Sequence, residues 1–181
     1  WYGMEMAIMQ VATGINYIDI EVEDIVKALA LYDVIQVWRS ADNITFNEIT
    51  DTDDLPAIID GSITGTWNVN NTSLTVVKNS NDPVTVNFTG TNPIDLQTII
   101  NQINTVLPKF ASQVPSNTNR LRITSDMLGL TSNLTLSGTA ASILGLSTVK
   151  TIGKAHRVPL TNPTTKYRFL DPDGLSTDYY K

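Results

Sequence analysis

The sequence predicts a mainly β protein of the α+β class, in which one long helix interrupts a series of short strands. Two observations carry this prediction. Apolar and polar residues alternate in segment after segment, as they do in half-buried strands. A single stretch, residues 93–107, instead repeats its apolar residues every three or four positions, which is the helical period. The 181 residues, 41% of them hydrophobic, are enough for a buried core in one domain or in two small ones.

The first part of the chain is expected to contain a strand, a helical turn and a hairpin. The apolar Met4–Val11 run has no clear period and favours no particular structure. Residues 15–26 alternate isoleucine and valine with acidic residues, which indicates a half-buried strand, and residues 24–31 suit a helical turn. Residues 33–40 and 45–50 read as two strands joined by a turn, and therefore as a hairpin.

The helix predicted at residues 93–107 has a clear start and end. Asn92 is expected to cap it, Pro93 suits its first position, and Asp95 complements the positive end of its dipole. Pro108 ends it. Its buried face is predicted to consist of Leu96, Ile99, Ile100, Ile103, Val106 and Leu107. The side chains expected to face away are Gln97, Asn101, Gln102 and Thr105.

Strands are predicted on both sides of this helix. Residues 73–78 and 84–89 alternate in the β manner around a turn-rich connection and form a predicted hairpin. After the helix we expect three strands and a short closing helix, at residues 110–114, 120–125, 134–138 and 140–146. This order allows the helix to cover one face of a single small antiparallel sheet. We therefore expect residues 73–147 to fold autonomously.

A resemblance to a known module is carried by the run TGTNPIDLQTIINQIN and by three later runs, RLRITSD, SNLTLSG and AASILGL. Together they resemble the small α+β module built around the IN motif of flagellar hook and hook-associated proteins. Similar modules occur in structural proteins of tailed-phage virions. Ile103 and Asn104 occupy the IN position. The long terminal helices that polymerise flagellar subunits are missing, and the phage relationship is therefore favoured.

The outer segments resemble parts of an immunoglobulin-like or fibronectin type III β-sandwich. The runs concerned are IQVWRSADNITFNEIT, which is similar to the C-C′ hairpin, and TKYRFLDPDGLSTDYYK, which is similar to the F strand and F-G turn. The resemblance implies a discontinuous β frame, residues 1–58 and 151–181, into which residues 59–150 are inserted as the IN-motif-like module. Too few strands are visible for a complete seven-stranded domain. Either a partner chain supplies the missing strand, or the chain is a fragment of a longer protein.

Charge and composition argue against several classes of function. The net charge is −6 and lysines and arginines do not cluster, so we expect no nucleic-acid partner. The absence of cysteine removes disulfides, thiolate nucleophiles and cysteine-based metal sites. No apolar stretch approaches the roughly 20 residues that span a bilayer, so no membrane partner is expected.

No catalytic or metal site is predicted. His156 is the only histidine, and no nucleophile signature lies near it. Two acidic clusters offer oxygen ligands of the kind that Ca²⁺ accepts: Asp51, Asp53 and Asp54, and Asp171, Asp173 and Asp178. Neither has the EF-hand spacing, and aspartate is a preferred turn residue, so we favour solvated turns. We expect no enzyme activity and no cofactor.

The predicted function is structural: a component of a tailed-phage virion that assembles with other virion proteins or with copies of itself. Capsid decoration, head fibre, neck and tail are all compatible positions. The apolar Met4–Val11 segment shows no partner within the chain, and the C-terminal strand stops early, which indicates surfaces that another chain covers. The candidate interface residues are Met4, Met6, Ile8, Met9, Tyr167, Tyr179 and Tyr180.

Two alternatives to this function remain open. One is a bacterial surface or flagellar-associated adhesin, which would share the same module. The other is a carbohydrate-binding virion module that recognises a host-surface glycan. That alternative needs a concave site, which the sequence does not reveal.

Overall fold

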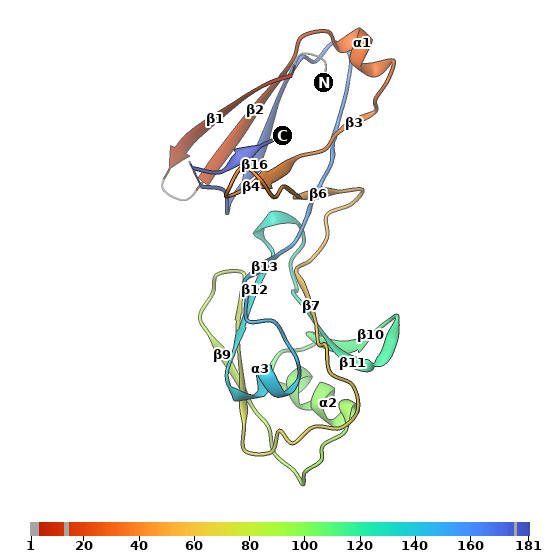
Figure 1. Ribbon diagram of the computed structural model, residues 1–181, viewed down its shortest axis with the longest axis vertical. Coiled ribbons are helices and arrows are strands. Elements are labelled where there is room, and N and C mark those ends of the chain that lie inside the picture. The colour runs from red at the N-terminus through yellow and green to blue at the C-terminus, as the bar shows by residue number, and fades with distance from the viewer. Residues whose placement is uncertain (1–3, 13–14, 176) are drawn as a thin grey trace. The chain divides into compact units, whose positions relative to one another are not determined.

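The computed structural model describes residues 4–12, 15–175 and 177–181, with side chains from residue 17 onward. The mainly β class is confirmed: small sheets dominate the described residues, and of their α-helices only the 11-residue α2 is longer than five residues. The chain divides into unit 1, Trp1–Leu55 with Lys154–Lys181, and unit 2, Pro56–Gly153. Unit 2 is continuous in sequence and interrupts unit 1, as the colour gradient of Figure 1 shows.

Unit 1 is built on a three-stranded antiparallel sheet in the order β1, β2, β16 (Figure 1). β1 spans Met4–Ala12, β2 spans Ile15–Val22 and β16 spans Lys166–Asp171. The alternation predicted for residues 15–26 is present in β2 from residue 17 to Val22, where the even-numbered residues are buried and the odd-numbered residues are not. The buried residues of this sheet include Ile18, Ile20, Val22 and Phe169.

β1 overturns one expectation from the sequence. The Met4–Val11 segment does have a partner within the chain, because β1 pairs with β2 along its length. Met6 lies opposite Ile20 and Ile8 lies opposite Ile18, and both of these β2 residues are buried. The sequence does not indicate this strand, because apolar residues occupy both its odd and its even positions and leave no alternation.

The remaining strands of unit 1 are short and form three further sheets. The first is three-stranded and contains β17 (Tyr179–Tyr180), β4 (Trp38–Ser40) and β5 (Asn47–Glu48). The second pairs β15 (Val158–Pro159) with β3 (Val34–Ile35), antiparallel. The third pairs β14 (Ala155–His156) with β6 (Thr50–Asp51), parallel. Helix α1 (Ile25–Leu29) follows β2 and is capped by Asp24, which accepts a hydrogen bond from the Lys27 amide at 3.0 Å.

The predicted strands at 33–40 and 45–50 are each broken into two, and the interruption has a specific cause. The Val37 amide donates to the Thr50 hydroxyl at 3.1 Å, and the Val37 carbonyl accepts from the Ile49 amide at 2.9 Å. The chain therefore changes pairing partner at Val37, from β15 on one side to β5 and β17 on the other. The predicted β4–β5 hairpin is confirmed, with a shorter ladder than expected.

Unit 2 contains two antiparallel sheets, not the single sheet expected, in the orders β13-β12-β8-β9 and β10-β11-β7. Helix α2 (Leu96–Val106) packs against β9, β10 and β11, and so contacts both. β11 pairs with β10 on one edge and with β7 on the other, so it cannot join the sheet that contains β12. Arg122 of β11 forms two hydrogen bonds of 2.7 Å with Asp60 of β7. The bounds are β7 Ile58–Asp60, β8 Ser73–Lys78, β9 Val84–Asn87, β10 Ala111–Val114, β11 Asn117–Thr124, β12 Asn133–Ser137 and β13 Thr151–Ile152. The β8–β9 hairpin is confirmed, and a short 3-10 helix (Gly129–Thr131) and α3 (Thr139–Ile143) flank β12.

Helix α2 begins later than predicted. Its N-cap is Asp95 and not Asn92: the Asp95 carboxylate accepts from the Thr98 amide at 3.0 Å and from the Thr98 hydroxyl at 2.7 Å. The preceding residue, Ile94, exchanges two backbone hydrogen bonds with Trp67, at 3.0 and 2.8 Å. This bridge holds the chain before Asp95 in an extended form, so the helix cannot start at the proline.

The buried face of α2 is close to the prediction. The buried residues are Leu96, Ile99, Ile100, Ile103 and Leu107. Val106 was placed wrongly, since 45% of it is exposed. Val106 is the last residue of the helix and lies about 80° around its axis from Leu96, at the border of the apolar stripe. Gln102, expected to face away, bonds to both backbone groups of Thr89, at 2.9 and 2.8 Å.

The two residues at the IN position have structural roles in unit 2. Ile103 is fully buried. Asn104 clamps the start of β10, because its amide nitrogen donates to the Ala111 carbonyl at 2.9 Å and its oxygen accepts from the Ala111 amide at 2.8 Å. Both contacts fasten the strand that follows to the end of the helix.

The compact unit is wider than residues 73–147. β7 and β13 lie outside that range, and the core of unit 2 also includes Ala57, Ile59, Trp67 and Val69. A fragment of residues 73–147 would expose the side chains that these residues cover. Pro56–Gly153 is therefore the segment to treat as a folding unit.

Candidate assembly interface

The outer edge of β1 is a nine-residue strand edge at the end of the sheet order. In an antiparallel sheet, successive residues point their N–H and C=O groups alternately to one side and to the other. Val22 donates its N–H to the Thr165 carbonyl at 2.8 Å and so points toward the β16 side of the sheet. Met4, which lies opposite Val22 on β1, must then direct its N–H and C=O groups away from β2. The same holds for every second residue of β1 up to Gln10. The outward-pointing residues are Met4, Met6, Ile8 and Gln10.

β1 lacks the features that commonly protect an edge strand. Within Met4–Ala12 the only charged residue is Glu5, and there is no proline. Edge strands usually carry lysine, proline, bulges or a short length that discourages pairing with another chain. The irregularity of β1 is confined to the register shift between Gln10 and Ala12, at one end. A long apolar edge with open backbone groups is the arrangement that accepts an added strand.

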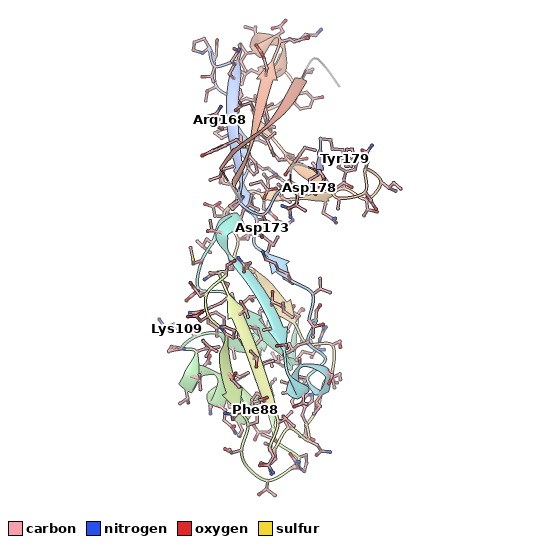
Figure 2. The ribbon with its side chains drawn as sticks, turned by 90° about the vertical axis from the view of Figure 1, so that its left-hand side faces the viewer. Phe88, Lys109, Arg168, Asp173, Asp178 and Tyr179 are labelled. Carbon is pink, nitrogen blue, oxygen red and sulfur yellow. The ribbon has the colours of Figure 1, made fainter. Side chains whose placement is uncertain are left out.

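The opposite edge of the same sheet is different. β16 carries two exposed charged residues, Lys166 and Arg168, and Arg168 forms two hydrogen bonds of 2.7 and 2.8 Å with Asp19. Figure 2 labels Arg168 on this strand. The guanidinium holds the pKa of the Asp19 carboxyl below its usual value, and Lys166 lies 3.5 Å from Glu21. These solvated charges protect the β16 edge, so the two edges of one sheet differ in their capacity to pair.

The C-terminal end is held within unit 1, contrary to the expectation of an unpaired strand. β17 pairs with β4, with Tyr179 opposite Ser40 and Tyr180 opposite Arg39. The Tyr180 hydroxyl donates to the Asp171 carboxylate at 3.1 Å. Burial and the neighbouring carboxylate raise the pKa of the Tyr180 phenol. The side chain thus fastens the last strand to the end of β16.

Asp171 is the centre of this fastening and is completely buried. Its two oxygens accept hydrogen bonds from Arg39 Nη1 at 2.9 and 2.7 Å. Asp178 lies 3.9 Å from Arg39 Nε and accepts from the Leu175 amide at 2.8 Å (Figure 2). A Cβ at Gly174 would collide with the Tyr180 hydroxyl, which explains the glycine in this turn. The acidic cluster weighed as a Ca²⁺ site therefore includes two carboxylates that face an arginine.

The other predicted chemical groups have structural partners too. Asp54 accepts a hydrogen bond from the His156 amide at 2.8 Å, and Asp51 lies 3.4 Å from the Lys154 ammonium. The exposed His156 ring bonds to the Arg157 carbonyl. Within the described part of the chain, no three histidines, cysteines or acids are arranged to hold a metal ion.

The predicted interface residues do not form one patch. Tyr167 lies on β16, across β2 from β1, and its hydroxyl donates to the Thr164 carbonyl at 2.9 Å. Tyr179 is 46% exposed, whereas Tyr180 belongs to the Asp171 network. The four remaining candidates lie in β1: Met4, Met6, Ile8 and Met9. β16 and β17 are also end strands of their sheets, but only the β1 group lies on an edge that is nine residues long and carries a single charged residue.

A groove of about 830 Å³ in unit 1 is a feature that the sequence did not reveal. Its lining includes the aromatic rings of Tyr32 and Trp38, and Tyr32 is 58% exposed. The polar residues in the lining include Glu23, Asp24, Asp33 and Gln36. The groove escaped prediction because the end of β2, α1, β3, Leu160 and Lys181 meet there only after folding.

No helix among the described residues has the length and apolar character needed to cross a membrane. In comparisons with protein-family models, curated proteins and solved structures, nothing matches this chain. The β1 edge and the groove are therefore the features from which a function can be inferred.

Proposed function

We propose that this protein is a structural component of a tailed-phage virion and works by protein–protein assembly, without catalysis. The observation that carries the assembly role is the outer edge of β1, which is long, almost uncharged and not paired with any other described strand. Strand addition at such an edge gains affinity from backbone hydrogen bonds and needs no cofactor. The resemblance of residues 73–147 to IN-motif modules supports the virion as the location. Other virion proteins and copies of the chain itself are the proposed partners.

A charged residue on the β1 edge is expected to prevent this assembly. Ala7 lies opposite Asp19, which is outside the core, so Ala7→Lys should leave unit 1 folded. Lysine on an edge strand discourages pairing with another chain. We expect particles made with the Ala7→Lys protein to contain about tenfold less of it than particles made with the unaltered protein, as measured by immunoblotting of purified virions.

The matched control is Leu170→Lys on the opposite edge. Leu170 is 44% exposed and lies on β16, the edge that already carries charges. This variant should enter particles at the normal level. Normal incorporation of Ala7→Lys, with circular dichroism that shows it folded, would contradict assembly through β1. Absence of the unaltered protein from purified virions would contradict the location.

A second candidate function is recognition of a host-surface glycan, and the groove favours it. The exposed Tyr32 ring beside carboxylates and an amide suits a neutral saccharide, because the ring covers an apolar face of the sugar while the oxygens accept hydrogen bonds from its hydroxyl groups. We expect Tyr32→Ala to lower glycan-array binding at least about tenfold. Tyr179→Ala, at a similarly exposed tyrosine outside the groove, should retain it. Equal binding by both variants, or no binding by the unaltered protein, would exclude this function.

A further inference from the structure

We propose that two copies of this chain pair antiparallel along β1 about a two-fold axis at Ala7. This inference rests on the proposed assembly role and names the partner. The paired β1 strands would join two three-stranded sheets into one continuous sheet of two β16-β2-β1 halves. Such an isologous contact satisfies the open edges of both copies at once, which a single partner of another kind would not do.

The backbone determines where the axis lies. Hydrogen bonds across a new pair form only between residues that point outward, and on β1 these are Met4, Met6, Ile8 and Gln10. Beyond Gln10 the register shifts, so regular pairing ends there. A two-fold axis at Ala7 matches all four residues, with Met4 opposite Gln10 of the second copy and Met6 opposite Ile8 of the second copy. Four matched pairs with two bonds each give about eight hydrogen bonds.

The sequence of β1 is compatible with this register. Glu5 lies opposite Met9 of the second copy, so the two glutamates do not face one another, as they would in a parallel, in-register pair. Ala7 meets its own equivalent in a non-hydrogen-bonded pair, where strands approach most closely, at about 4.5 Å between Cα atoms. A small residue suits that position. Moving the axis by one residue, which shifts the register by two, loses one of the four matched pairs.

Single cysteines test this register directly, because the chain has no cysteine of its own. A disulfide requires Cα atoms about 4.4–6.8 Å apart. Ala7→Cys should therefore cross-link to itself under mild oxidation and give a covalent dimer of the full chain on non-reducing gels. Met9→Cys lies on the same strand, but its two copies would be about 14 Å apart along the strands. It should give about tenfold less dimer.

A mixture of the Glu5→Cys and Met9→Cys proteins completes the test. These positions face one another in the proposed pair, so the mixture should form a heterodimer that neither variant forms alone. Equal cross-linking of Ala7→Cys and Met9→Cys, or an Ala7→Cys protein that stays monomeric, would overturn the two-fold pairing. If that occurs while Ala7→Lys still fails to enter virions, the assembly role stands and the second copy is excluded as the partner.

Discussion

Replacing Ile103 with aspartate is expected to unfold unit 2. Ile103 has no exposed surface and lies in the core that α2 shares with both sheets of the unit. Loss of a buried isoleucine side chain costs about 2–5 kcal/mol, and the new carboxylate would be buried without a partner, which adds a further penalty. The two costs together approach the free energy of unfolding of a typical domain, which is about 5–15 kcal/mol. Circular dichroism at 222 nm, where α2 is the longest contributing helix, measures the effect.

Val106→Asp is the matched control for this prediction. It introduces the same carboxylate on the same helix, but Val106 is 45% exposed, and surface substitutions usually change stability by less than about 0.5 kcal/mol. The helical period alone placed Val106 on the buried face, so the control separates the sequence pattern from the structure. Similar losses from both aspartates would contradict the observed exposure of Val106. Gln102→Asp should be intermediate, because it breaks the two bonds to Thr89.

Replacing Arg39 with leucine is expected to destabilise unit 1 strongly. Asp171 is fully buried, and Arg39 bonds to both of its oxygens. Removing one partner of a buried ion pair leaves an uncompensated charge and costs about 3–5 kcal/mol. β4 and β17 should be affected together, because Arg39 lies in β4 and Tyr180 in β17 bonds to the same carboxylate. Urea unfolding followed by NMR signals of unit 1 measures the loss.

Arg168→Leu provides the comparison. Arg168 also forms two hydrogen bonds to one aspartate, with distances close to those of the Arg39 pair. Its side chain is 52% exposed, however, and solvent screens exposed ion pairs so that they contribute little. We expect the urea midpoint to change little. A loss as large as that of Arg39→Leu would indicate that burial of Asp171 is not the source of the effect.

Local pattern was sufficient for much of unit 2. The β8–β9 hairpin follows from apolar residues that repeat every two positions, and the buried face of α2 from apolar residues that repeat every three or four positions. Both patterns are local in the sequence. The two-sheet arrangement could not be predicted, because it depends on a pairing between Asp60 and Arg122, far apart in sequence. β7 and β13 are too short to show any period. The start of α2 could not be predicted either, because it depends on the bridge between Ile94 and Trp67, which are also far apart in the sequence.

The position of β1 at the edge of its sheet could not be predicted from the sequence. Apolar composition indicated the Met4–Val11 segment, but a run without alternation does not show that one edge is paired and the other open. The C-terminal tyrosines looked unpaired because their partners, Ser40 and Arg39, lie far away in the sequence. The groove could not be predicted, because the residues that line it come from distant parts of the sequence and lie together only in the folded unit 1.

Residue-resolved amide hydrogen exchange along β1 tests assembly through this edge most directly. The amides of Glu5, Ala7 and Met9 point toward β2 and should exchange slowly at any protein concentration. The amides of Met6 and Ile8 point outward, so we expect them to exchange slowly in concentrated solution and rapidly after dilution. Rapid exchange of the Met6 and Ile8 amides at every concentration and in assembled particles would contradict strand addition at β1.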